Sequence, residues 1–139
     1  MTSLEQFTQL EYNIHQLVKP FFTAVSMYYT VGLSYRSKNR KSRKLINTGI
    51  NWLTPHVLHI ALSRLGVEHE IIEEERPWAH GKTLTYKYLR VNCKQLKQVG
   101  EEKFMQVVRE VLRDIFYNKI RVKRGEKPWR EKPVGYNVQ

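Results

Sequence analysis

Six cationic side chains lie within nine positions of one short stretch, residues 36–44, with no acidic residue among them. They are Arg36, Lys38, Arg40, Lys41, Arg43 and Lys44. Lys and Arg at this density neutralise the phosphates of a nucleic acid, which positions a protein without reading base sequence. If all six contact duplex DNA, this basic run alone gives a log-log salt slope of about −5. We therefore predict that residues 36–44 contact a phosphate backbone.

The charge of the whole chain has the same sign as the basic run. The 139 residues contain 24 Lys and Arg against 13 Asp and Glu, a formal net charge of +11. Such a surplus indicates a polyanionic partner, and we expect nucleic acid, DNA rather than RNA. The hydrophobic share of 41% can support the core of one domain.

The cysteine count and the apolar stretches bear on the compartment. Cys93 is the single cysteine, so no intrachain disulfide can form and a reducing compartment is expected: the cytoplasm, the nucleoid, or a nucleus. The first residues lack the apolar segment of a secretory signal. The most apolar stretch, residues 20–33, is shorter than the roughly 20 residues that span a bilayer. No membrane contact is expected.

A second group of candidate contact residues lies on a predicted helix, residues 55–65. Thr54 is a good N-cap, Pro55 suits the first helical position, and Gly66 suits the left-handed position after the helix. The 3.6-residue period divides this helix into an apolar side and a side free to touch a ligand. The residues of the free side are His56, His59, Ile60, Ser63 and Arg64.

A predicted β-hairpin follows, with its turn at residues 77–82. Leu84, Tyr86 and Tyr88 alternate with polar residues, the period of a half-buried strand, and we interpret the tyrosines as core. Stacking on bases is the alternative role for Tyr86 and Tyr88, and also for Tyr28 and Tyr29, which we likewise interpret as core. The candidate contact residues of the hairpin end are Arg76, Trp78, His80 and Lys82.

The flanking segments complete a chain that is expected to be mainly α with a small β-hairpin (α+β). Residues 1–35 are predicted to form a helical hairpin whose second helix, from Pro20, is apolar nearly all round and offers a dimer interface or a site for a protein partner. A C-terminal helical region is predicted for residues 93–124, with Asn92 as a cap and a long helix after Gly100. Residues 125–139 are predicted to form a basic extended tail. Further candidate contacts here are Arg121, Lys123, Arg124 and Trp129.

The order of these elements resembles a winged helix-turn-helix with additional N- and C-terminal helices. Residues 40–91 resemble the DNA-binding unit of PadR-like and MarR-like regulators, through "RKSRKLINTG", "INWL" and the hairpin "EIIEEERPWAHGKTLTYKYLRV". The resemblance implies a nucleic-acid-binding unit over residues 36–92. In it, residues 55–65 would be the recognition helix, with His56, His59, Ser63 and Arg64 towards a groove and Ile60 near a thymine methyl. The hairpin end would lie along an adjacent minor groove or backbone.

We therefore expect a non-catalytic DNA-binding regulator or replication accessory. The alternatives are an RNA-binding component of a ribonucleoprotein, a protein–protein adaptor, and a metal-dependent nuclease. The nuclease alternative rests on Glu68, Glu70, Glu73, Glu74 and Glu75, but Thr85 stands where a hairpin-borne nuclease site needs an acid two residues before Lys87. No C-x-x-C or H-x-x-x-H spacing accompanies the histidines, so neither a metal nor a cofactor is expected.

Overall fold

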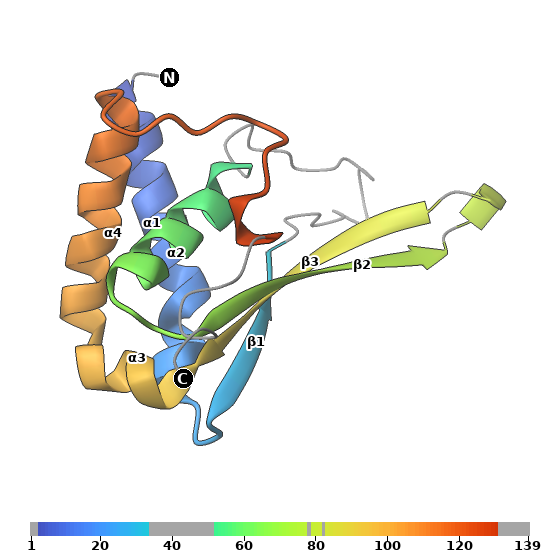
Figure 1. The fold of residues 1–139 in the computed structure, drawn as a ribbon, viewed down its shortest axis with the longest axis horizontal. Helices are drawn as coiled ribbons and strands as arrows, with labels where there is room; N and C mark the ends of the chain where they lie inside the picture. Colours follow the sequence, from blue (N-terminus) through green and yellow to red (C-terminus); the bar gives the residue numbers. More distant parts are fainter. Residues whose placement is uncertain (1–2, 34–51, 78, 82, 131–139) are drawn as a thin grey trace.

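The computed structural model describes residues 3–33, 52–77, 79–81 and 83–130. Within these ranges the chain forms four α-helices and one three-stranded antiparallel sheet, an α+β architecture as expected (Figure 1). The elements are α1 (Ser3–Thr23), β1 (Tyr28–Gly32), α2 (Leu53–Arg64), β2 (His69–Pro77), β3 (Thr83–Asn92), α3 (Cys93–Val99) and α4 (Glu101–Phe116), with 3₁₀ turns at Ala79–Gly81 and Pro128–Arg130.

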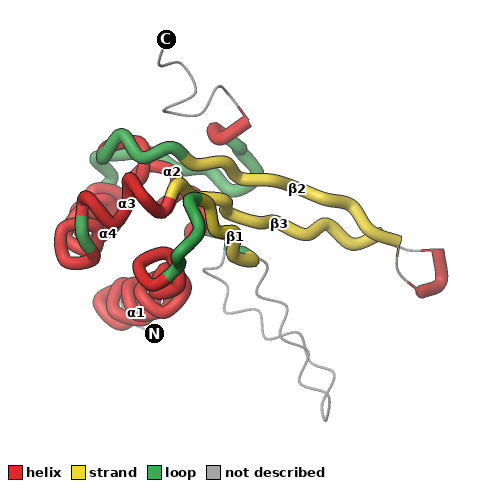
Figure 2. The backbone as a smooth tube through the Cα atoms, turned by 90° about the horizontal axis from the view of Figure 1, so that it is seen from below, coloured by secondary structure: helices red, strands yellow, loops and turns green. Residues whose placement is uncertain are grey.

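The sheet has the strand order β1-β3-β2, so β3 is the central strand. The predicted hairpin is confirmed: β2 and β3 are antiparallel neighbours, with Ile71 opposite Leu89 and Glu73 opposite Lys87. The outer part of this hairpin extends past the helices as a two-stranded ribbon (Figure 1), and the view in Figure 2 shows the same projection from another side. The short strand β1 lies along the other edge of β3.

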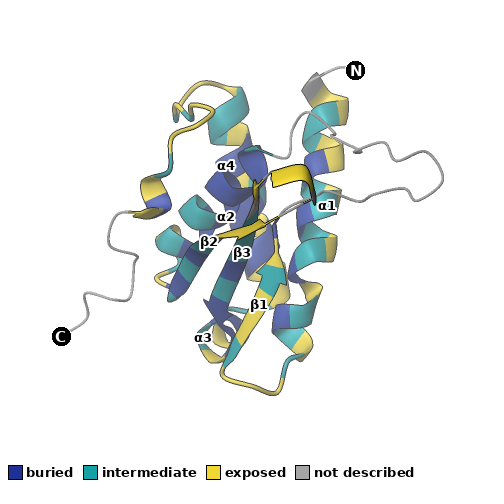
Figure 3. Cartoon of the chain, turned by 90° about the vertical axis from the view of Figure 1, so that its right-hand side faces the viewer, coloured by how far each residue is buried: buried dark blue, intermediate teal, exposed yellow. Residues whose placement is uncertain are grey.

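The core lies between the helices and one face of the sheet. Leu10, Ile14 and Val18 follow a four-residue spacing along one side of α1 and are fully buried. Leu89 and Val91 alternate along β3 and are also fully buried. In Figure 3 the buried residues gather where helices and sheet meet, whereas the hairpin becomes exposed towards its end. The sheet therefore has a core face and an outer face.

The prediction of a second N-terminal helix, and with it the helical hairpin of residues 1–35, is wrong. Helix α1 continues through Pro20 to Thr23, and the Ala24 amide donates to the Pro20 carbonyl oxygen at 2.9 Å. Residues 28–32, the sequence YYTVG, then form β1. Aromatic and β-branched residues are favoured in strands, and pairing with β3 satisfies the backbone of this segment. The apolar residues of this segment therefore belong to a strand and not to a second helix.

The other helix boundaries were predicted in part. Helix α2 begins at Leu53, two residues before the predicted start, and Thr54 is buried within its first turn instead of capping it. The end is as predicted, because Gly66 has a φ of +67° just after the helix. The side chain of Asn92 accepts a hydrogen bond from the Gln95 amide and so caps α3, as expected. Gly100, with a φ of +91°, separates α3 from α4.

Candidate functional site

The strongest candidate site is a set of aromatic and cationic side chains on the face of the sheet opposite the core. Directly opposed residues of antiparallel strands project to the same face. Tyr86 pairs with Glu74, Tyr88 with Ile72 and Arg90 with Glu70. These residues alternate with Leu89 and Val91, which face the core. We call the set Tyr28, Arg76, Tyr86, Tyr88 and Arg90 the outer-face cluster.

The part of this cluster nearest the hairpin end is a pair of parallel tyrosine rings beside a guanidinium group. The rings of Tyr86 and Tyr88 have centroids 6.4 Å apart and planes inclined by 19°. The guanidinium carbon of Arg76 lies 5.0 Å from the Tyr86 centroid and 5.9 Å from the Tyr88 centroid. Arg76 also donates a hydrogen bond to Glu74 at 3.1 Å, which helps to hold it in place. One cation therefore lies against two aromatic rings.

A second arginine–tyrosine pair lies at the base of the hairpin. The guanidinium carbon of Arg90 is 4.0 Å from the centroid of the Tyr28 ring, across the β1–β3 pairing. Aromatic rings stack on nucleobases, and guanidinium groups bind phosphates and contribute cation–π contacts. The outer-face cluster thus combines the two chemistries that bind a nucleic-acid strand.

Tyr86 and Tyr88 were predicted to lie in the core, and this prediction is wrong. Both side chains are only partly buried, whereas Leu89 and Val91 are fully buried. Alternation identifies a two-faced strand but does not say which face is inside. Arg90 was missed as a site residue, and Tyr28 was interpreted as core. The apolar set Ile71, Leu89 and Val91 was the sequence signal that marks the true core face.

The predicted contact residues of the basic run lie outside the described residues, as do two residues of the hairpin end. They are Arg36, Lys38, Arg40, Lys41, Arg43, Lys44, Trp78 and Lys82. The last described residue before the run is Leu33, whose amide donates to the Lys87 carbonyl oxygen at 2.8 Å. Arg36 follows Leu33 by three residues in the sequence.

The two remaining candidates of the hairpin lie on its exposed part. Arg76 belongs to the outer-face cluster, and His80 is exposed in the turn between β2 and β3. The φ of His80 is +63°, a left-handed conformation required by the tight connection of the two strands.

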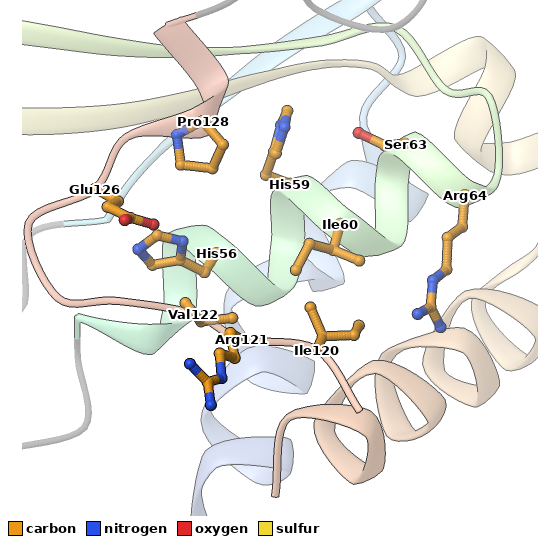
Figure 4. A pocket seen from close by; sticks show the side chains of 10 residues that line it. All are labelled: His56, His59, Ile60, Ser63, Arg64, Ile120, Arg121, Val122, Glu126 and Pro128. Carbon is orange, nitrogen blue, oxygen red and sulfur yellow. The ribbon is translucent and has the colours of Figure 1, made fainter. Parts of the chain in front are cut away.

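The prediction that one side of α2 is free is wrong at His56, which the chain after α4 covers, whereas Arg64 near the end of the helix is exposed. His56 is only 3% exposed, and its ring centroid lies 4.9 Å from that of Trp129. Trp129 itself is 5% exposed, so the predicted extended tail folds back over α2 as far as Arg130. A pocket of about 510 Å³ remains between α2 and residues 120–128 (Figure 4). It is lined by His56, His59, Ile60, Ser63, Arg64, Ile120, Arg121, Val122, Glu126 and Pro128.

His59 of α2 and His69 of β2 form a neutral hydrogen-bonded pair. His69 Nδ1 donates to the Val67 carbonyl oxygen at 2.8 Å, so its Nε2 accepts from His59 Nδ1 at 2.9 Å. Burial, and then the proximity of His69 and His56, lower the pKa of His59 to about 4. Burial also lowers the pKa values of His56 and His69. At neutral pH this side of α2 offers no histidine charge to a phosphate.

The remaining predicted cations divide between surfaces. Arg64 donates to Asp114 of α4 at 2.8 Å, and Arg121 lines the same pocket beside α2. Lys123 and Arg124 are exposed in the segment after α4. These four residues are on the helical side of the protein, so the structure does not bring them together with Arg76 and the outer-face cluster.

Glu73 of β2 forms ion pairs with Lys127 and Arg130, which connect the segment after α4 to the hairpin. Lys127 and Arg130 each donate to its Oε2 atom at 2.8 Å, and its side chain is only 15% exposed. Burial raises the pKa of this carboxyl, but the hydrogen bonds and charges of Lys127 and Arg130 outweigh it and hold the pKa below its ordinary value. Glu73 has a structural role in this arrangement.

Replacing Glu73 with Gln is expected to lower the free energy of unfolding by about 1–3 kcal/mol, the range for hydrogen bonds to charged groups. The matched control is Glu74→Gln, which breaks an exposed ion pair with Arg76 and should change the stability much less than Glu73→Gln. Urea denaturation at pH 7 measures both. Equal effects of the two substitutions would contradict the role of Glu73.

Other kinds of site find little support in the described part of the chain. There, no group of three or more His, Cys, Asp or Glu residues is arranged to hold a metal ion. Cys93 is buried, and burial raises the pKa of its thiol, which disfavours the reactive thiolate. None of the described helices combines the length and apolar character needed to cross a bilayer. Comparison with protein-family models, curated proteins and solved structures finds no match to this chain.

Proposed function

We propose that this protein binds nucleic acid without catalysing a reaction on it, and that the outer-face cluster is the contact surface. The proposal is carried by one observation: two arginines and three tyrosines share the face of the sheet that lies opposite the buried core. A polyanion with aromatic bases matches both components of this surface, and the net charge of +11 favours such a partner.

The sequence position of the basic run, shortly after β1, supports the same proposal. The run follows Leu33, which is hydrogen-bonded to the strand that carries the tyrosine pair. Six cations next in sequence to this point can extend the contact along a phosphate backbone. We infer the role that the sequence suggested, a DNA-binding regulator or replication accessory.

The burial of His56 on α2 bears on which element of the protein would contact the nucleic acid. A helix followed directly by a β-hairpin retains the element order that the winged-helix resemblance implies. Since His56 and His59 pack under Trp129 and are neutral, we assign the principal contact to the hairpin and not to α2.

The proposal is tested by measuring nucleic-acid binding by fluorescence anisotropy as the salt concentration is raised from about 25 to 200 mM. We compare the double variant R76A/R90A with K94A/K103A, which removes the same charge from exposed positions of α3 and α4. The outer-face variant should bind at least about tenfold more weakly, with a salt slope smaller by about 2. The control should retain affinity within about threefold.

Two outcomes would refute the proposal. One is that neither DNA nor RNA binds at the lowest salt concentration. The other is that the two double variants lose the same affinity, since a general charge effect would then explain binding.

A further inference from the structure

We propose that the outer-face cluster takes single-stranded nucleic acid, with unpaired bases stacked on Tyr86 and Tyr88 and the phosphates on Arg76 and Arg90. This inference rests on the proposed function and specifies its ligand.

The spacing of the tyrosine rings suits bases that are not stacked on each other. Tyr86 and Tyr88 are two residues apart on β3, and their nearly parallel rings have centroids 6.4 Å apart. Consecutive bases of a duplex are only about 3.4 Å apart along the helix axis, and each base face is covered by the next. A duplex therefore offers no free base faces to two such rings, whereas an unstacked strand offers one per nucleotide.

Arg76 and Arg90 lie where they can contact the phosphates of a nucleic-acid strand whose bases stack on the tyrosines. Arg76 is beside both tyrosine rings, on the neighbouring strand β2, and Arg90 is two residues after Tyr88 on β3. The stretch of β3 from Tyr86 to Arg90 covers about 13 Å at the rise of a β-strand. Two cationic groups thus flank two aromatic rings along one partly exposed face, a combination of groups that binds single strands with little sequence preference.

The surrounding surface does not resemble the core of a protein interface. The outer face carries Glu74 and Arg76 as an exposed ion pair, with side chains 49% and 52% exposed. Charged residues are depleted from the centres of protein–protein interfaces, where desolvation costs free energy. The same ion pair can open without burial when a phosphate replaces the carboxylate as the partner of Arg76. A nucleic-acid strand fits this face better than a second protein surface.

The test uses the full chain and four labelled probes of one mixed sequence: single-stranded DNA, single-stranded RNA and the two corresponding duplexes. Each single strand also carries 2-aminopurine at its centre, because the fluorescence of this base reports a change in stacking. We expect single strands to bind at least about tenfold more tightly than duplexes, with a change in 2-aminopurine emission. Comparing the affinities of the DNA and RNA single strands shows which of the two the site prefers.

The variants separate stacking from folding and from general charge. Y86A/Y88A should bind single strands at least about tenfold more weakly, whereas Y86F/Y88F keeps the rings and should remain within about threefold of the unaltered protein. The matched control is Y12A/Y117A, which removes two exposed tyrosines from the helical part of the molecule. Circular dichroism confirms that each variant is folded.

The results distinguish this inference from the function on which it rests. If duplexes bind as tightly as single strands, or if Y86A/Y88A binds like the control, the single-strand inference is overturned. The proposed function would still stand in that case, provided that R76A/R90A weakens binding. Loss of all nucleic-acid binding would overturn both.

Discussion

Replacing Leu89 with alanine is expected to lower the free energy of unfolding by about 2–5 kcal/mol. Leu89 is fully buried in the central strand, opposite Ile71 on one side and Val31 on the other. Truncation removes its transfer free energy and leaves a cavity in a closely packed region. Chemical denaturation monitored by circular dichroism measures the loss.

The control for this prediction is the adjacent residue. Tyr88→Ala removes a larger side chain, but from the outer face, where the contacts with Tyr86 and Arg76 are lost without leaving a core cavity, and it should cost less than about 1 kcal/mol. A larger loss for Tyr88→Ala than for Leu89→Ala would show that the two faces of the sheet are assigned the wrong way round. The Tyr86–Tyr88 site would then lose its basis.

The second large effect is expected from pH. The pKa of His59 is about 4 in the folded protein, against an ordinary value of 6.5. Between these values the unfolded chain binds a proton that the folded protein does not, so stability is complete above pH 6.5 and falls as the pH falls towards 4. At 1.36 kcal/mol per pKa unit, the loss between pH 7 and pH 5 is about 2 kcal/mol from His59.

The groups around His59 reinforce this direction. His56 and His69 also have lowered pKa values, so their protonation on unfolding adds to the loss. Lys87 lowers the pKa of His56 further, and Glu126 opposes it. Urea unfolding of the unaltered protein and of His59→Gln at pH 7, 6 and 5 measures the effect. We expect the variant to lose clearly less stability over this range, and parallel curves would contradict the assignment.

The local features of the fold could be predicted from the sequence, because their signals are local. Gly66 after α2 needs a positive φ, and Asn92 has the side chain to cap a helix, and both lie where they were expected. The hairpin was predicted from two strand-like arms around a turn, and the register bears this out. Such signals depend on a few neighbouring residues and not on the rest of the chain.

The missed features depend on contacts between distant parts of the chain. The segment Tyr28–Gly32 is a strand because β3 is available to pair with it, and an apolar run of this length fits a helix or a strand equally well. Trp129 follows a proline amid cations and was expected to be exposed, but Glu73 holds its neighbours Lys127 and Arg130 against the hairpin. The direction of Tyr86 and Tyr88 was set by which face the helices cover.

The candidate site was correspondingly predicted only in part. Arg76 and His80 are exposed on the hairpin as expected, whereas His56, which was expected to face a groove, is covered by Trp129. A helix with one polar side is typical of a surface, but here neutral histidines make that side compatible with burial under Trp129. The partner that covers it comes from the far end of the described chain.

The strand order has a consequence for the order of folding. Strands β2 and β3 are joined by a short turn and can pair early, whereas Gly32 must find Tyr88 across more than fifty intervening residues. Closing so long a loop costs more chain entropy, so β1 is expected to join the sheet after the hairpin has formed. Tyr28 of the outer-face cluster belongs to β1, and its ring lies against Arg90 of β3. The cluster is therefore complete only after this late docking step.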